Sequence, residues 1–114
     1  MPYRIEIAEG AEAEAHAAYL WLSQRNPEFA GRWYKGLLAA IDDLTFFPRK
    51  WERAPAHGPG ARRMLYGTGG SRFRVIYLVI EPEEEGEEGL IRVVHVLHGA
   101  RRPPTEQDSD GGEG

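Results

Sequence analysis

The chain contains no cysteine among its 114 residues, and none of its apolar runs approaches the length of a membrane-spanning helix. Without cysteine there are no disulfides, thiolate metal sites or thiol redox chemistry. A helix needs roughly 18–20 consecutive apolar residues to cross a bilayer. The N-terminal segment MPYRIEIAEG also lacks the basic-then-apolar order of a signal peptide. These absences predict a cytoplasmic protein without a membrane contact, a metal ion or another cofactor.

The length and composition favour one folded domain. A hydrophobic fraction of 41% is typical of a globular chain, and 114 residues are too few for two separate cores. We predict that this domain covers residues 1–102. The remaining segment, PPTEQDSDGGEG at 103–114, has nothing to bury, so we predict a disordered acidic tail there.

The formal net charge of −4 conceals a local surplus of positive charge. Acidic residues gather at 81–88 and in the tail, whereas basic residues gather between Arg49 and Arg74, where Glu52 is the only acid. The basic residues of this cluster are Arg49, Lys50, Arg53, Arg62, Arg63, Arg72 and Arg74. The cluster predicts a cationic surface that attracts a polyanion, either phosphate groups or the acidic face of a protein.

Hydrophobic periodicity predicts the fold class. An alternating strand at 3–7 is followed by two amphipathic helices at 9–24 and 27–47, and then by strands at 62–66, 72–80 and 90–98. This order predicts an α+β fold with an N-terminal strand, an antiparallel helical hairpin and a three-stranded antiparallel meander, the helices covering one face of the sheet.

Two segments raise questions about what covers the sheet. The second helix has an apolar stripe that we predict to be buried, formed by Phe29, Trp33, Leu37, Ile41, Leu44 and Phe47. The strand at 72–80 is apolar on both sides, so its second face must be covered by the loop around Trp51 or by a partner.

The acidic segment 81–88 is predicted to be a solubilising hairpin loop. Alternatively, Glu83, Glu84 and Glu85 fold back on the basic cluster and imitate phosphate.

The order of these motifs resembles the RelE/ParE superfamily of toxins from bacterial type II toxin–antitoxin systems. The resemblance depends on NPEFAGRWYKGLLAAIDDLTFFP, RRMLYG followed by RFRVIYLV, and the closing IRVVHVLHGARR. It implies a mixed α+β domain with a mostly antiparallel sheet. It also implies a cytoplasmic toxin that a cognate antitoxin wraps and inactivates, in a possible toxin–antitoxin hetero-oligomer.

The superfamily contains two activities. RelE-like members cut mRNA on the ribosome, and the resemblance places Arg74, Arg101 and Arg63 (or Arg62) at positions matching their catalytic cations. RelE-like enzymes also carry a late tyrosine, whereas this chain has no tyrosine after Tyr77. That departure favours a ParE-like toxin, which poisons DNA gyrase without acting as a nuclease. The alternatives are an mRNA endonuclease and a non-toxic module that retains only partner binding.

The residues themselves bear on the nuclease alternative. Cleavage of RNA needs an acid, a base and cations on the phosphate. His95 and His98 are the acid–base candidates, but a separation of three along a strand turns them to opposite faces. By this alternation one face carries Arg92, Val94, Val96 and His98, and the other carries Val93, His95 and Leu97. His98 stands before Gly99 at the end of the strand, so it is the catalytic candidate if the chain is a nuclease. The predicted target- or partner-binding residues are Arg62, Arg63, Arg72, Arg74, Trp51, Arg101 and Arg102.

Overall fold

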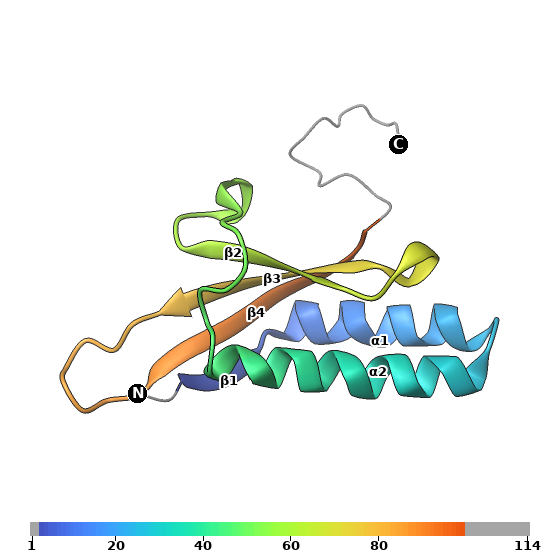
Figure 1. Cartoon of the computed structure of the whole chain (residues 1–114), viewed down its shortest axis with the longest axis horizontal. Helices are drawn as coiled ribbons and strands as arrows, with labels where there is room; N and C mark the ends of the chain where they lie inside the picture. The colour runs from blue at the N-terminus through green and yellow to red at the C-terminus, as the bar shows by residue number, and fades with distance from the viewer. Residues whose placement is uncertain (1–2, 100–114) are drawn as a thin grey trace.

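The structure is a computed structural model and describes residues 3–99. It consists of a helical layer packed against one face of a sheet (Figure 1). The helices and strands are β1 (Tyr3–Ile7), α1 (Glu9–Ser23), α2 (Pro27–Asp42), β2 (Ala61–Tyr66), β3 (Phe73–Ile80) and β4 (Gly89–His98). Three short 3-10 helices lie in the connections: η1 (Asp43–Thr45), η2 (Pro55–His57) and η3 (Gly69–Ser71). The α+β prediction is confirmed.

The sheet has the strand order β1-β4-β3-β2. Strands β2, β3 and β4 pair antiparallel, as the predicted meander requires. Strand β1 pairs parallel with β4, from Tyr3 opposite Gly89 to Ile7 opposite Val93, so the complete sheet is mixed. The N-terminal strand therefore lies beside the last strand and closes one edge of the meander.

The sequence at the link between the helices explains how the hairpin forms. Asn26 caps α2, because its side-chain oxygen accepts a hydrogen bond from the Phe29 backbone N–H at 3.0 Å. Pro27 occupies the first helical turn, where its missing N–H leaves no donor unsatisfied. Helix α1 buries mainly alanines on its inner face, which lets its backbone lie close to β4.

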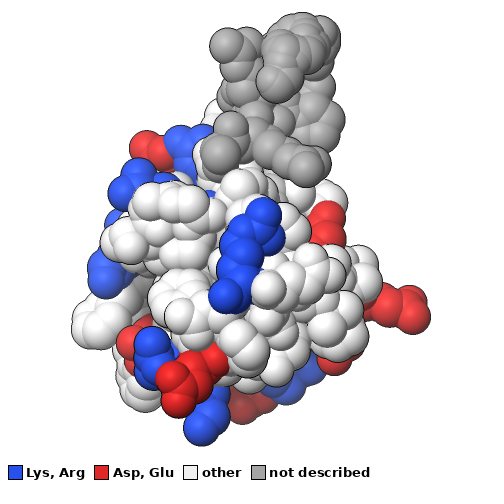
Figure 2. All heavy atoms as spheres, turned by 90° about the vertical axis from the view of Figure 1, so that its right-hand side faces the viewer, with Lys and Arg blue, Asp and Glu red and all other residues white. Residues whose placement is uncertain are grey.

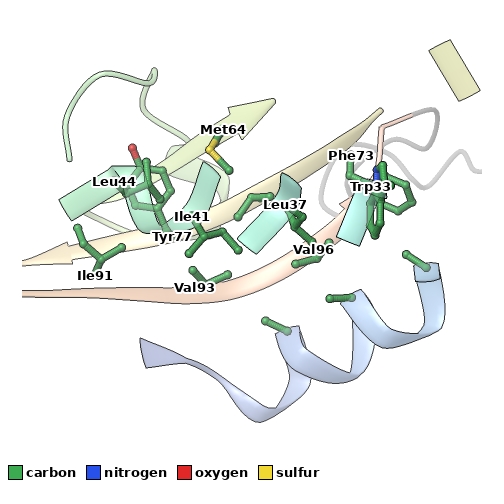
Figure 3. Close-up of a cluster of buried hydrophobic side chains, with 14 of the residues drawn as sticks. Trp33, Leu37, Ile41, Leu44, Met64, Phe73, Tyr77, Ile91, Val93 and Val96 are labelled. Carbon is green, nitrogen blue, oxygen red and sulfur yellow. The ribbon is translucent and has the colours of Figure 1, made fainter. Parts of the chain in front are cut away.

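The core lies between α2 and the sheet. Figure 3 shows Trp33, Leu37, Ile41 and Leu44 from the helical side meeting side chains of β2, β3 and β4. The strand residues of this cluster include Met64, Phe73, Val75, Tyr77, Ile91, Val93 and Val96. The hydroxyl of Tyr77 donates a hydrogen bond to the Pro48 carbonyl at 2.7 Å. Burial raises the pKa of this hydroxyl, and the nearby Arg62 guanidinium opposes that shift.

The predicted apolar stripe of the second helix is wrong at its end. Helix α2 stops at Asp42, and η1 carries the chain onward with about 3.0 residues per turn instead of 3.6. The change of pitch keeps Leu44 in the core at 2% exposure but turns Phe47 outward, at 65% exposure. Phe46 beside it is 71% exposed.

A β-bulge changes the predicted faces of β4. Tyr77 pairs with Val93 but Ile76 pairs with His95, so Val94 is passed over in the register. Val96 therefore joins Val93 in the helix-side core, while Val94 packs on the other side of the sheet. The strict alternation that grouped Val94 with Val96 is wrong, because the extra residue shifts the phase of the strand.

The second face of the sheet is covered in part by the segment that leads into β2. Ala54 packs with Ala61 and Ile76 in a small second cluster. The Ala54 backbone N–H donates to the Ala61 carbonyl at 2.8 Å, which holds this segment on the sheet. Trp51 instead packs against the helix-side core. The prediction that the loop around Trp51 covers the second face therefore holds for the segment after Trp51 and not for Trp51 itself.

Two glycines of α2 should respond oppositely to alanine. A Cβ at Gly36 would lie 2.2 Å from the Tyr66 hydroxyl oxygen, which donates to the Trp33 carbonyl at 2.9 Å. A Cβ at Gly31 meets nothing within 4 Å. Gly31→Ala should stabilise the fold by up to about 1 kcal/mol through helix propensity, whereas Gly36→Ala should be about 1–2 kcal/mol less stable than Gly31→Ala because Tyr66 must move. Urea unfolding of both variants measures the difference, and equal stabilities would contradict it.

Candidate partner-binding face

The open face of the sheet, on the side away from α1 and α2, carries the predicted interaction residues Arg63 and Arg74. Side chains alternate along each strand, and Met64, Phe73, Val75 and Tyr77 take the helix side. The open face therefore includes Arg63, Leu65, Arg74, Ile76, Leu78, His95 and Leu97. In its register Arg74 lies between Leu65 of β2 and Leu97 of β4, and we call these three residues the Arg74 row.

Coverage of the open face is uneven. Ile76 is 1% exposed, beneath Ala54 and the segment that contains η2. Leu65 is 44% exposed, and Arg74 and Leu97 are half-buried. The Arg74 row therefore presents a cation between two leucines at an accessible part of the sheet. This combination suits a partner segment that has both carboxylates and apolar side chains.

Neighbouring arginines take different roles. Arg63 lies one row from Arg74 and forms an ion pair with Glu52. Arg62 points to the helix side, where its guanidinium donates to the carbonyl oxygens of Trp51 at 2.7 Å and of Arg49 at 3.3 Å. Arg62 therefore holds the 49–51 segment against the sheet. It is not on the same face as Arg63 and Arg74.

The prediction of one cationic surface from Arg49 to Arg74 is wrong. Arg49 pairs with Glu81, and the Lys50 amine lies 5.2 Å from the centre of the Trp51 ring. Figure 2 shows the end of the molecule where α1 meets α2, and there the basic side chains form separate groups divided by uncharged surface. The fold brings together a smaller set of basic residues than predicted. Arg63 and Arg74 share the open face, and Arg72 is exposed where η3 leads into β3.

The acidic hairpin loop is confirmed between β3 and β4, but it does not screen the Arg74 row. Glu81 pairs with Arg49, and Glu88 lies 3.8 Å from Arg4. The loop leaves β3 after Ile80, six residues beyond Arg74, which corresponds to about 20 Å along a strand. The alternative in which Glu83, Glu84 and Glu85 imitate phosphate on the basic cluster is therefore wrong, since only Glu81 reaches a member of it.

The two histidines of β4 lie on opposite sides of the sheet, and of the two it is His95 that shares the open face with the Arg74 row. His98 packs against Phe73 and Trp21, with ring centroids 4.9 and 5.3 Å away, and its Nε2 lies 2.8 Å from the Gly70 carbonyl oxygen. His95 pairs with Ile76 and has its Nδ1 3.4 Å from both carboxylate oxygens of Glu14. The prediction that the two rings take opposite faces is confirmed, because Phe73 belongs to the helix-side core and Ile76 to the second cluster.

The proposed nuclease set is therefore not assembled from the described residues. Arg63 and Arg74 lie on the open face, His98 lies at the helix side, and the predicted Arg101 and Arg102 fall outside residues 3–99. Within that range no three His, Asp or Glu side chains are grouped to hold a metal ion. His95, in contrast, lies on the open face in the same row as Arg63, with Ile76 between them. Its Nδ1 is 3.4 Å from the Glu14 carboxylate, and its ring centroid is 5.6 Å from that of His57. The described residues of this face therefore combine cations and apolar side chains with a His–Glu pair.

One contact group was missed from the sequence. The Arg25 guanidinium lies 4.0 Å above the Trp21 ring and donates to the Trp21 carbonyl at 3.2 Å. Trp21 also contacts His98, so it joins α1 to the end of β4. A Trp–Arg pair four residues apart on a helix was the available signal, because such residues are neighbours on the helix surface.

The same architecture occurs in a solved toxin–antitoxin structure. The chain is similar to a structure titled as the chromosomal ParDE toxin–antitoxin system from P. aeruginosa, with a TM-score of 0.65 and 15% identity over 84% of this chain and 95% of that one. A RelBE2 toxin–antitoxin complex from Mycobacterium tuberculosis gives a TM-score of 0.49 and 17% identity over 86% and 99%. No curated protein sequence matches the chain.

The fold thus falls in the class of small α+β toxins of the RelE/ParE superfamily. A family model described as the ParE toxin of the type II toxin–antitoxin system parDE matches residues 5–103. The chain therefore belongs to the ParE toxin family. None of the helices within residues 3–99 has both the length and the apolar character needed to cross a membrane.

Proposed function

We propose that this ParE-family toxin arrests growth by acting on DNA gyrase, and that a cognate antitoxin neutralises it by covering the Arg74 row. The family match over residues 5–103 is the observation that supports the toxin activity. The match to a ParE family model supports gyrase poisoning over mRNA cleavage, and so does the lack of a tyrosine after Tyr77, because RelE-like enzymes carry such a tyrosine.

The proposed antitoxin segment is acidic and partly apolar. Leu65 is 44% exposed beside Arg74, so a bound segment gains apolar burial and a charge-assisted contact at the same place. Arg63, already paired with the exposed Glu52, offers a second guanidinium one row away. Such a segment, carried by the product of an adjacent gene, is expected to shield the open face.

Induced expression tests the proposal. The toxin alone should stop growth and induce the DNA-damage response while transcripts stay intact, and co-expression of the neighbouring gene should restore growth. Purified toxin should inhibit supercoiling by gyrase. Codon-phased cuts in mapped transcript ends, lost in Arg74→Ala, would instead establish the nuclease. Normal growth at high toxin levels would contradict both and favour a non-toxic binding module.

A further inference from the structure

Phe46 and Phe47 are the most exposed large apolar side chains of the described chain, at 71% and 65%. Each aromatic side chain can bury roughly 150–250 Å², so the two together leave roughly 200–340 Å² of aromatic surface in water. The largest apolar patch on a typical monomer is about 300–600 Å² and is often functional. Two adjacent phenylalanines therefore approach that size by themselves.

The backbone around this pair is held in place on both sides. Phe46 N–H donates to the Asp43 carbonyl at 3.1 Å, and Lys50 N–H donates to the Phe47 carbonyl at 3.2 Å. Directly after the pair, the Pro48 carbonyl accepts the buried Tyr77 hydroxyl at 2.7 Å. Because the segment is already ordered, little conformational entropy is lost when a partner binds it. A rigid aromatic pair has the properties of an interaction hot spot.

The charges at this end of the molecule define what the partner must carry. Figure 1 shows that the end of α2, the start of β1 and the β3–β4 loop lie at the same end. Arg49 is neutralised by Glu81, and Arg4 lies 3.8 Å from Glu88. Within residues 3–99 the acids at this end that make no ion pair are Asp42, Asp43, Glu83, Glu84, Glu85 and Glu87. Lys50 is a cation close to the pair, with its amine over the Trp51 ring, but these acids outnumber it. The field around the phenylalanines is therefore net negative.

A negative field repels phosphate groups and acidic protein segments, so neither nucleic acid nor the proposed acidic antitoxin segment complements this surface. The complement is an apolar pocket with a rim of lysine or arginine. We infer that Phe46 and Phe47 insert into such a basic-rimmed pocket on the protein that the toxin attacks. This inference rests on the proposed function and assigns target contact and antitoxin contact to different faces, since Arg74 lies on the open face of the sheet.

A double variant, Phe46→Ser with Phe47→Ser, tests the inference in the full-length toxin. Growth arrest by the variant should require about 100-fold more toxin than the wild type, as expected when two hot-spot side chains are lost. Its Kd for the antitoxin should stay within about threefold of the wild type. The matched control is Leu20→Ser with Leu38→Ser, which removes two exposed apolar side chains from α1 and α2 and should leave arrest unchanged.

A second variant keeps both phenylalanines and reverses the charge beside them. Asp42→Lys with Asp43→Lys should also weaken arrest, by about tenfold, because the basic rim of the pocket is then repelled.

If the Phe46→Ser, Phe47→Ser variant is folded and still arrests growth at wild-type levels, the inference fails while the proposed function stands. Loss of antitoxin binding in that variant, or conversion of a wild-type dimer to a monomer, would show that the pair is covered by the antitoxin or by a second copy. If the wild type does not arrest growth, the proposed function fails and this inference fails with it.

Discussion

Trp33→Ala is expected to lower the stability of the domain by about 3–5 kcal/mol, the range for removing a large aromatic side chain from a core. Trp33 is 3% exposed and lies between Phe73 and Tyr66, with ring centroids 5.0 and 5.9 Å away. Its Nε1 donates to the Ser71 carbonyl at 3.2 Å. The variant therefore loses packing to β2 and β3 together with the contact that fixes η3.

Thermal unfolding measures this effect, and the melting temperature should fall by roughly 15 °C or more for a domain of this size. Trp33→Phe should recover most of the packing but not the hydrogen bond, which contributes about 1 kcal/mol. Trp21→Ala is the matched control, because Trp21 is 39% exposed and should cost much less. If Trp33→Ala and Trp21→Ala melted at the same temperature, the assignment of Trp33 to the centre of the core would be wrong.

The burial of Trp33 is the kind of feature that local sequence can predict. It recurs with Leu37 and Ile41 at helical spacing, and all three lie in the core. The strands after it were also predictable, because β-branched and aromatic runs are bounded by turn residues. In these regions each local preference agrees with the tertiary contacts, so the helical hairpin and the meander follow from the sequence.

Features that depend on distant contacts were not predictable in this way. The parallel pairing of β1 with β4 joins residues at opposite ends of the chain, and nothing in residues 3–7 specifies the partner. The bulge at Val94 inserts one residue without a sequence mark such as glycine. The end of α2 at Asp42 follows no proline or glycine, so the stripe seemed to continue to Phe47.

The candidate site also combines features that local sequence could predict with features that depend on distant contacts. Arg62 and Arg63 are adjacent in the sequence but serve opposite faces of β2, which strand alternation could have indicated. The ion pair between Arg49 and Glu81 spans 32 positions and could not be read from charge clustering. The dense basic segment therefore predicts a larger cationic surface than the fold presents, because three of its seven charges, on Arg49, Arg62 and Arg63, are engaged with loop residues.

Arg74→Glu is expected to weaken antitoxin binding by about 100-fold, within the range for a charge pair that is largely desolvated on binding. Arg74 is half-buried between Leu65 and Leu97, so a carboxylate there would be placed among apolar groups and would face the acidic antitoxin segment. Calorimetry with the antitoxin at two salt concentrations should show both the lower affinity and a weaker salt dependence.

Arg32→Glu is the control for this prediction. It makes the same change in net charge at an exposed position of α2, in the layer opposite the open face, and should alter the affinity by less than about threefold. Equal affinities of the Arg74→Glu variant and the wild type would show that the antitoxin does not use the Arg74 row.

Expression in cells separates the two proposed surfaces, because the Arg74→Glu variant should remain toxic but escape neutralisation. The Phe46 and Phe47 double serine variant should do the reverse, binding antitoxin normally while arresting growth only at about 100-fold higher toxin levels. Opposite outcomes from two variants of one small domain would require that the antitoxin and the target occupy separate surfaces.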